Sequence, residues 1–284
     1  MGKPYRGKGY AMRLNLFQKK GAVIPVVPVN GGIGMAMPLR SGVSAASLEP
    51  QLVRAFGMKS APAVALRINS PGGSAVQSRL IYQRIRGLAE EKKKTVIVAV
   101  EDVAASGGYM IALAGDEIIV DPSSIVGSIG VVFAGFGFPR LIDKLGIDRR
   151  VHTAGQSKVI LDPFQPEKPE DVARLKQLQH EVHETFIALV KARRPRLADD
   201  PDLFTGAFWS GERGVALGLA DRVGDLDSVL REKYGADVQL KVMGTEKGLL
   251  RRRLGLSAPL SAAAIAEAAV GTLEERLLWN RYGL

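Results

Sequence analysis

The chain has 284 residues, of which 46% are hydrophobic and 24% are charged, so it can form one large domain or two modest ones with a sizeable core. It contains no cysteine, which excludes a disulfide framework, a cysteine nucleophile and thiolate zinc sites. The formal net charge is +10, but the basic residues lie in small scattered clusters without interleaved aromatic side chains. We therefore expect no nucleic-acid partner.

Residues 1–20 are basic and have no apolar segment after their charges, so no secretory signal is expected. The longest uncharged runs, 103–115 and 125–139, are glycine-rich and shorter than the roughly 20 apolar residues of a spanning helix. The sequence therefore predicts a cytoplasmic protein without a signal peptide or transmembrane helix. Its basic N-terminal arm, residues 1–20, suits at most a peripheral contact with the inner membrane.

Strands and helices alternate along the first half of the chain. Residues 22–29 are predicted as a strand, and their two prolines favour a place at the edge of a sheet. A short helix is expected at 47–56. Further strands are expected at 63–68, 96–100, 117–120 and 127–132, with helices at 75–91, 106–114 and 141–145 between or after them. Such alternation is typical of parallel β-α-β units.

The pattern changes after residue 150. Residues 169–191 predict a long charged helix whose apolar stripe includes Leu178 and Phe186. Short helices at 210–217 and 229–234 and a strand at 238–242 are expected to follow. The alanine-rich stretch 261–278 is predicted as a helix, and we expect Leu277, Leu278 and Trp279 at its end to dock on a partner chain.

Ser106 lies between a predicted buried strand and a predicted buried helix. The residues on either side are small, Ala104–Ala105 and Gly107–Gly108, so the backbone can turn sharply and a substrate can approach closely. A nucleophilic serine is displayed in this way, near free N–H groups at a helix start. A serine that only caps the helix gives the same pattern, and these residues alone do not separate the two interpretations.

The loop 69–73, Asn-Ser-Pro-Gly-Gly, follows the preceding strand. In an open α/β sheet, ligands bind at the carboxyl ends of the strands, where this loop and Ser106 are both expected. The backbone N–H groups of Gly72 and Gly73 have no side chains beside them and suit an oxyanion hole. A tight Pro-Gly turn without any catalytic role explains the same residues.

A serine nucleophile needs a base. His180 and His183 lie three residues apart on a charged helix and are expected on a solvated face, and His152 has no supporting motif. The alternative is Lys158, which is followed by Val159, Ile160 and Leu161. An exposed lysine is protonated at neutral pH, but burial among apolar neighbours disfavours the ammonium form and makes a lysine base feasible. No metal site is expected.

Several motifs occur together in a fixed order: Asn69–Gly73, Ala104–Tyr109, Gly127–Val131 and Gly155–Lys158 followed by Asp162–Phe164. In this combination, the segment from about 63 to 228 resembles peptidase family S49, the signal peptide peptidase A/SohB group. Further along the chain, Ser210–Arg213 and Gly218–Asp221 resemble the closing segment of the family.

The resemblance implies an α/β protein with a ClpP/crotonase-like fold of repeated β-β-α units around a parallel sheet. We expect the chain to divide into the basic N-terminal arm, residues 1–20, a peptidase domain of this fold over residues 21–245 and a C-terminal helical extension over 246–284. The resemblance also implies a Ser/Lys dyad without a cofactor, in which Ser106 is the nucleophile and Lys158 the general base. The oxyanion hole falls on Gly72 and Gly73, with the Gly107 N–H as a further candidate, and Ser128 matches a serine that orients the lysine.

The function expected from the resemblance is hydrolysis of peptides, such as signal-peptide remnants or other short or unfolded chains, by a homo-oligomeric ring whose neighbouring subunits complete the sites. Two alternatives stay open. Glu101 and Asp102 precede Ser106, so a crotonase-type acyl-CoA hydratase or isomerase would have carboxylates at hand, and a CoA-binding assay separates the two enzymes. A non-catalytic scaffold of the same fold is the other alternative.

Overall fold

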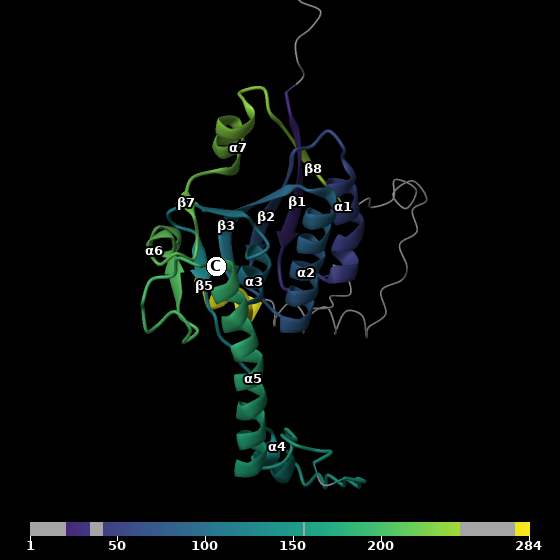
Figure 1. The fold of residues 1–284 in the computed structure, drawn as a ribbon. Coiled ribbons are helices and arrows are strands. Elements are labelled where there is room, and N and C mark those ends of the chain that lie inside the picture. Colours follow the sequence, from purple (N-terminus) through teal and green to yellow (C-terminus); the bar gives the residue numbers. More distant parts are fainter. Residues whose placement is uncertain (1–20, 35–41, 156, 245–275) are drawn as a thin grey trace, which may run out of the picture.

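A mostly parallel β-sheet runs through the computed structural model, which describes residues 21–34, 42–155, 157–244 and 276–284 (Figure 1). Its strands follow the order β6-β5-β3-β2-β1-β8, with β4 beside β3 and β7 beside β4. Every pairing is parallel except that of β5 with β6. The strands are β1 Val23–Asn30, β2 Ala63–Ser70, β3 Thr95–Ala105, β4 Glu117–Val120, β5 Ile125–Gly127, β6 Phe208–Ser210, β7 Arg222–Val223 and β8 Gln239–Val242. The parallel β-α-β organisation expected from the sequence is confirmed.

Helices cover both faces of this sheet. The larger core packs one face against α1, α2, α3 and the end of α5, and the smaller core packs the other face against α7. The helices are α1 Ala45–Gly57, α2 Ala75–Lys92, α3 Gly107–Ala112, α4 Pro139–Lys144, α5 Pro169–Arg193, α6 Gly211–Ala216 and α7 Leu226–Tyr234. Strand β3 is buried on both faces, which is why its sequence is a continuous apolar run before Glu101.

The expectation that the first strand lies at a sheet edge is wrong, because β1 pairs with β2 on one side and with β8 on the other. The carbonyls of Ala22 and Val26 accept hydrogen bonds from the β8 side, so every second residue faces that way. Pro28 faces the same side, beyond the last residue of β8. Pro25 faces the β2 side, before pairing with β2 begins at Val26. Pro28 therefore removes no ladder hydrogen bond, and Pro25 lies directly before the β2 ladder begins, so an interior strand tolerates both.

Helix α5 projects from the body of the molecule (Figure 1). Its buried residues are Phe186 and Val190, near its C-terminal end, whereas Leu178 is 57% exposed. The predicted apolar stripe thus packs on the core only at one end. Helix α4 lies at the opposite end of α5, away from the sheet. We call the described residues of 133–168, which include α4, the distal segment.

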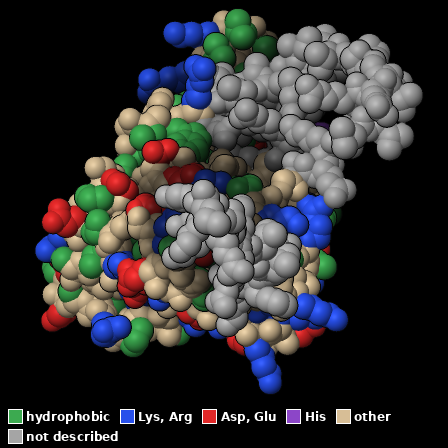
Figure 2. Space-filling model, turned by 90° about the horizontal axis from the view of Figure 1, so that it is seen from above, with side chains coloured by type: hydrophobic (Ala, Val, Ile, Leu, Met, Phe, Trp, Pro, Cys, Tyr) green, Lys and Arg blue, Asp and Glu red, His purple; other side chains and the backbone are tan. Residues whose placement is uncertain are grey.

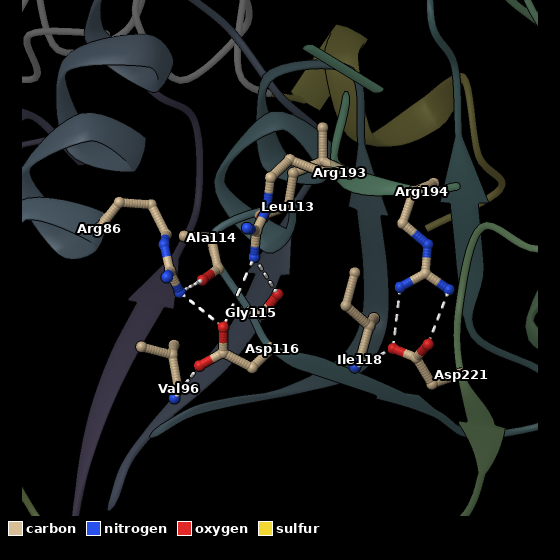
Figure 3. Close-up of polar contacts among 10 residues, drawn as sticks. All are labelled: Arg86, Val96, Leu113, Ala114, Gly115, Asp116, Ile118, Arg193, Arg194 and Asp221. Carbon is tan, nitrogen blue, oxygen red and sulfur yellow. Dashed lines mark hydrogen bonds and ion pairs between the residues drawn. The ribbon is translucent and has the colours of Figure 1, made fainter. Parts of the chain in front are cut away.

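Arginines at the C-terminal end of α5 fix it to the sheet (Figure 3). Arg194 forms a two-pronged ion pair with Asp221, with N–O distances of 2.8 and 2.9 Å, and the Asp221 carboxylate also accepts from the Ile118 N–H. Arg193 donates to the carbonyls of Leu113 and Gly115, at the end of α3. The helix that carries the distal segment is therefore tied to β4 and to the helix that follows Ser106.

We expect Asp221→Ala to lower the free energy of unfolding by about 2–4 kcal/mol, because it leaves a largely buried guanidinium and a strand N–H without their acceptor. Asp221→Asn, which keeps an acceptor but loses the charge, should cost less. Denaturant unfolding of the two variants beside the original chain measures both effects. Equal stability of all three chains would contradict this role.

Charged side chains of both signs are exposed on the described surface. On the face shown in Figure 2, Lys and Arg side chains are interspersed with Asp and Glu side chains. The predicted basic arm, residues 1–20, and most of the helix expected at 261–278 lie outside the described residues. Over the ranges that are described, no helix combines the length and the apolar character needed to cross a bilayer.

Candidate active site

Ser106 occupies the single residue between β3 and α3. Its backbone has φ 51° and ψ −119°, a conformation that non-glycine residues rarely adopt. Its N–H donates to the Gly127 carbonyl at 2.8 Å, and its carbonyl accepts from the Met110 N–H at 3.0 Å. The side chain makes no capping bond and has no hydrogen-bond partner among the described residues. The capping interpretation is therefore not supported, and the turn is the kind that displays a nucleophile.

The loop after β2 lies directly against Ser106, because β2 and β3 are neighbours and Ser70 pairs with Ala104. Gly72 has φ +105°, and a Cβ on it would lie 2.8 Å from the Ser106 Cβ. Its N–H donates to the Ser70 hydroxyl at 3.2 Å. The Gly72 N–H expected in an oxyanion hole thus already has an acceptor, and this glycine is required because nothing larger fits beside Ser106.

Two other N–H groups at this place are free. Those of Gly73 and Gly107 have no acceptor within the described ranges, and a Cβ on Gly107 would lie 3.3 Å from the Gly73 nitrogen. Gly73 has φ +141° and is fixed from behind by Ile33, whose carbonyl accepts from the Ser74 N–H. Adjacent free N–H groups beside a serine hydroxyl are what an oxyanion hole requires.

We expect Gly72→Ala to disable the site more than it destabilises the fold. The new methyl group would clash with the Ser106 Cβ and with the Ala105 carbonyl, at 2.8 and 2.9 Å, and would force a strained φ. The strain should cost about 1–3 kcal/mol of unfolding free energy, while displacement of Ser106 should reduce turnover about 100-fold or more. Unfolding and peptide-hydrolysis assays test this. The matched control is Gly87→Ala on α2, where a Cβ meets nothing within 4 Å.

Ser128 lies just after β5 and joins the same site through the Ser106–Gly127 hydrogen bond. It has φ 53° and is 4% exposed, and its N–H donates to the Ala207 carbonyl at 2.7 Å. Its hydroxyl accepts from the Tyr282 hydroxyl at 3.2 Å. The structure therefore brings Ser106, Gly72, Gly73, Gly107 and Ser128 together, as the order of the motifs implied.

Ser106 opens into a cavity of about 440 Å³ with a mainly apolar lining. Arg281 is the one charged residue of this lining within the described chain. The apolar residues come from the loop after β1, from α3, from the strip after β5 and from α5, and include Ile33, Met110, Val131, Val182 and Phe186. The cavity suits an apolar side chain held next to the serine hydroxyl.

The carboxylates before Ser106 point to other partners. Glu101 pairs with Arg67 at 3.5 Å, and Asp102 accepts from the Asn69 amide at 2.6 Å. Neither residue lines the cavity. The feature that favoured an acyl-CoA hydratase or isomerase is therefore not found at the site.

The histidines also lie outside the cavity. His180 is exposed and lies 3.9 Å from Glu184, and His152 is exposed in the distal segment. His183 differs from the expected solvated residue, since its Nε2 lies 2.9 Å from the Ile129 carbonyl and links α5 to the strip after Ser128. Within the described ranges, no group of three or more His, Asp or Glu side chains is placed to hold a metal ion.

Lys158 is the predicted site residue that a single chain does not bring to Ser106. It is exposed, and it lies in the distal segment, which contacts the start of α5 through the Leu161 N–H and the Asp171 carboxylate at 3.5 Å. Val182, which lines the cavity, lies further along the same helix. At 1.5 Å per residue, roughly 16 Å of α5 separates Asp171 from Val182. Figure 1 shows α4 and the chain around it at the end of α5 that points away from the sheet.

The distal segment has an internal framework of its own. Arg149 forms an ion pair with Asp162 at 2.8 Å and lies over the Phe164 ring at 5.0 Å. The hydrogen bond from Arg149 holds the pKa of the Asp162 carboxyl below its usual value. The Phe138 N–H donates to the Pro163 carbonyl at 2.6 Å. The Asp162–Phe164 motif thus shapes the segment that carries Lys158 rather than the cavity itself.

Sequence reasoning missed the C-terminal residues of the site. Leu278 and Arg281 line the cavity, and Trp279 and Tyr282 pack on Val103 and Ala105 of β3. Leu277 is 58% exposed. The sequence led us to expect that these residues dock on a partner chain. In the structure, Leu278 and Trp279 contact their own chain instead. No local motif signals this contact, because it depends on where the end of the chain returns in space.

The mostly parallel sheet with helices on both faces, and the strained serine and glycine loop at the carboxyl ends of its strands, agree with the ClpP-like α/β fold that the sequence predicts. The chain belongs to peptidase family S49, whose family model matches residues 89–240. The fold agrees with a solved structure of the 1510-N membrane-bound stomatin-specific protease in complex with a substrate peptide, at a TM-score of 0.51 and 16% identity, over 89% of this chain and 99% of that one.

Two curated relatives illustrate how the chain relates to longer proteins. It is 34% identical to a Haemophilus influenzae protein named as a SohB protease, over 73% of this chain and 58% of that protein. It is 57% identical to a Brucella abortus protein named Na(+)/H(+) antiporter NhaA, over 92% of this chain but only 37% of that protein. The chain thus spans little more than a third of the Brucella relative.

Proposed function

We propose that this chain is a serine peptidase in which Ser106 is the nucleophile. The observation that carries the proposal is the strained turn at Ser106. Its hydroxyl has no hydrogen-bond partner in the described part of the chain and lies beside the N–H groups of Gly73 and Gly107 at an apolar cavity. Membership of family S49 supports the same activity. Of the expected oxyanion-hole residues, Gly73 and Gly107 have N–H groups without an acceptor among the described residues, and Gly72 packs closely against Ser106.

We propose Lys158 as the general base, supplied to Ser106 by a neighbouring copy of the chain. Within one chain Lys158 is exposed on the distal segment, which contacts the start of α5, and it does not line the Ser106 cavity, so we do not expect a dyad there. A second copy whose distal segment lies over the cavity would bring the amine to the hydroxyl. Ser128, buried beside Ser106, would then orient that amine.

Exposed apolar side chains of the distal segment support the homo-oligomer, for which a ring remains the expected form. A monomer would leave this surface in water, whereas contact with another copy would bury it. The large apolar residues more than half exposed there are Phe133, Phe136, Leu141, Leu145 and Ile147.

The chemistry would be acyl transfer. The Lys158 amine of the neighbouring copy takes the hydroxyl proton as the Ser106 oxygen bonds to the peptide carbonyl carbon. The N–H groups of Gly73 and Gly107 hold the resulting oxyanion. The lysine then gives its proton to the leaving amine as the C–N bond breaks, and water hydrolyses the acyl-enzyme by the same route. The apolar cavity favours peptides with an apolar side chain at the cleaved bond.

The test is to treat the purified full chain with a fluorophosphonate, map the labelled residue by mass spectrometry, and follow hydrolysis of casein and of peptides with apolar residues. We expect a single label on Ser106 and cleavage beside apolar residues. A label elsewhere, or CoA binding without peptide hydrolysis, would overturn the proposal. The expected membrane contact stays a prediction, since residues 1–20 lie outside the described ranges.

A further inference from the structure

Residues 276–284, which we call the C-terminal segment, contact the candidate site through Leu278, Arg281 and Tyr282. Figure 1 shows this yellow segment beside α3 and the end of α5. It begins with a helical turn over residues 276–280, and the Tyr282 N–H donates back to the Trp279 carbonyl at 2.9 Å. Leu278 and Arg281 form part of the wall of the Ser106 cavity.

Tyr282 anchors this segment. Its side chain is 7% exposed, meets the Phe208 ring edge-on with centroids 5.0 Å apart, and packs on Val103 and Ala105. Its hydroxyl donates to the Ser128 hydroxyl at 3.2 Å and lies 3.5 Å from the Pro71 carbonyl. The phenol thus lies between the glycine loop and the strip after β5, which are the two backbone segments that flank Ser106.

The position of the Tyr282 hydroxyl conflicts with the dyad. A lysine amine that is oriented by Ser128 and takes the Ser106 proton has to lie within about 3 Å of both hydroxyl oxygens. The Tyr282 hydroxyl already lies within hydrogen-bond distance of Ser128, and its ring is held in place by Phe208 and by Val103 and Ala105 of β3. The phenol and an incoming lysine therefore compete for Ser128.

We propose that the C-terminal segment is an intramolecular inhibitor. Its Tyr282 hydroxyl occupies Ser128, and the segment has to be displaced before a lysine can bind there and complete the site. This inference rests on the proposed function, because it assumes that Ser106 and a lysine do the chemistry. The segment adds a condition for activity. When Tyr282 is docked, the nucleophile and the oxyanion hole are in place, but the Tyr282 hydroxyl occupies the position on Ser128 where the lysine amine would bind.

The experiment compares Tyr282→Ala and Tyr282→Phe with the unchanged full chain, by kcat/KM on a fluorogenic peptide with an apolar residue at the cleaved bond and by the rate of fluorophosphonate labelling at Ser106. If about a tenth of the molecules have the segment displaced, Tyr282→Ala should raise both rates roughly tenfold. Tyr282→Phe, which keeps the contact with Phe208 but frees Ser128, should raise them less. The matched control is Leu277→Ala, an exposed residue of the same segment, which should change neither rate.

Unchanged or lower rates in both tyrosine variants, with normal labelling of Ser106 in the unchanged chain, would overturn the inhibitor role and leave the peptidase proposal intact. Absence of labelling at Ser106 in every chain would overturn both. Tyr282→Phe keeps the ring in place, so the test does not depend on whether Tyr282→Ala folds well.

Discussion

Replacement of Ser106 by alanine is expected to reduce peptide hydrolysis by at least about 10³-fold and to abolish fluorophosphonate labelling, because the acyl-enzyme cannot form without the hydroxyl. The fold should hardly respond. Alanine has to adopt the same strained φ of 51°, and the lost oxygen has no hydrogen-bond partner among the described residues. We expect the free energy of unfolding to change by no more than about 0.5 kcal/mol.

Ser123→Ala is the matched control for this variant. Ser123 is exposed in the turn between β4 and β5, and the structure records a hydrogen bond for its backbone N–H but none for its hydroxyl. The peptide hydrolysis and fluorophosphonate labelling of the Ser123→Ala variant should equal those of the unchanged chain. Hydrolysis that persists in Ser106→Ala above the level of a mock purification would remove Ser106 from the role of nucleophile.

Replacement of Lys158 by alanine is expected to abolish turnover as well, and mixing this variant with Ser106→Ala should restore it. If each site takes its serine from one chain and its lysine from another, random assembly of equal amounts leaves about a quarter of the sites complete. Subunits should be exchanged by dilution and reconcentration before the hydrolysis assay. Recovery on this scale measures directly that the dyad forms between chains.

Lys176→Ala, on the exposed surface of α5, is the matched control and should be active on its own. Failure of the mixture to recover, with subunit exchange shown by differently labelled chains, would mean that the two residues act within one chain after a rearrangement of the distal segment. Full activity of Lys158→Ala alone would mean that another group is the base.

The sequence by itself was enough to predict the parts of the site that depend on neighbouring strands. Small residues around Ser106 and the glycines after Ser70 indicate sharp turns, and alternation of strands and helices indicates a parallel sheet. The carboxyl ends of adjacent parallel strands lie side by side, so the Ser106 turn and the glycine loop had to meet. Local turn chemistry and strand periodicity carry this information over a few residues at a time.

Only the tertiary structure decided which N–H groups are free, where Lys158 lies and what covers Ser128. The Gly72 N–H is taken by Ser70, the distal segment is held away from the cavity by a projecting α5, and the end of the chain returns to place Tyr282 on Ser128. The two prolines of β1 proved compatible with an interior strand because of the registers on its two sides. These features depend on packing between residues far apart in the chain, which leaves no periodic or local signal in the sequence.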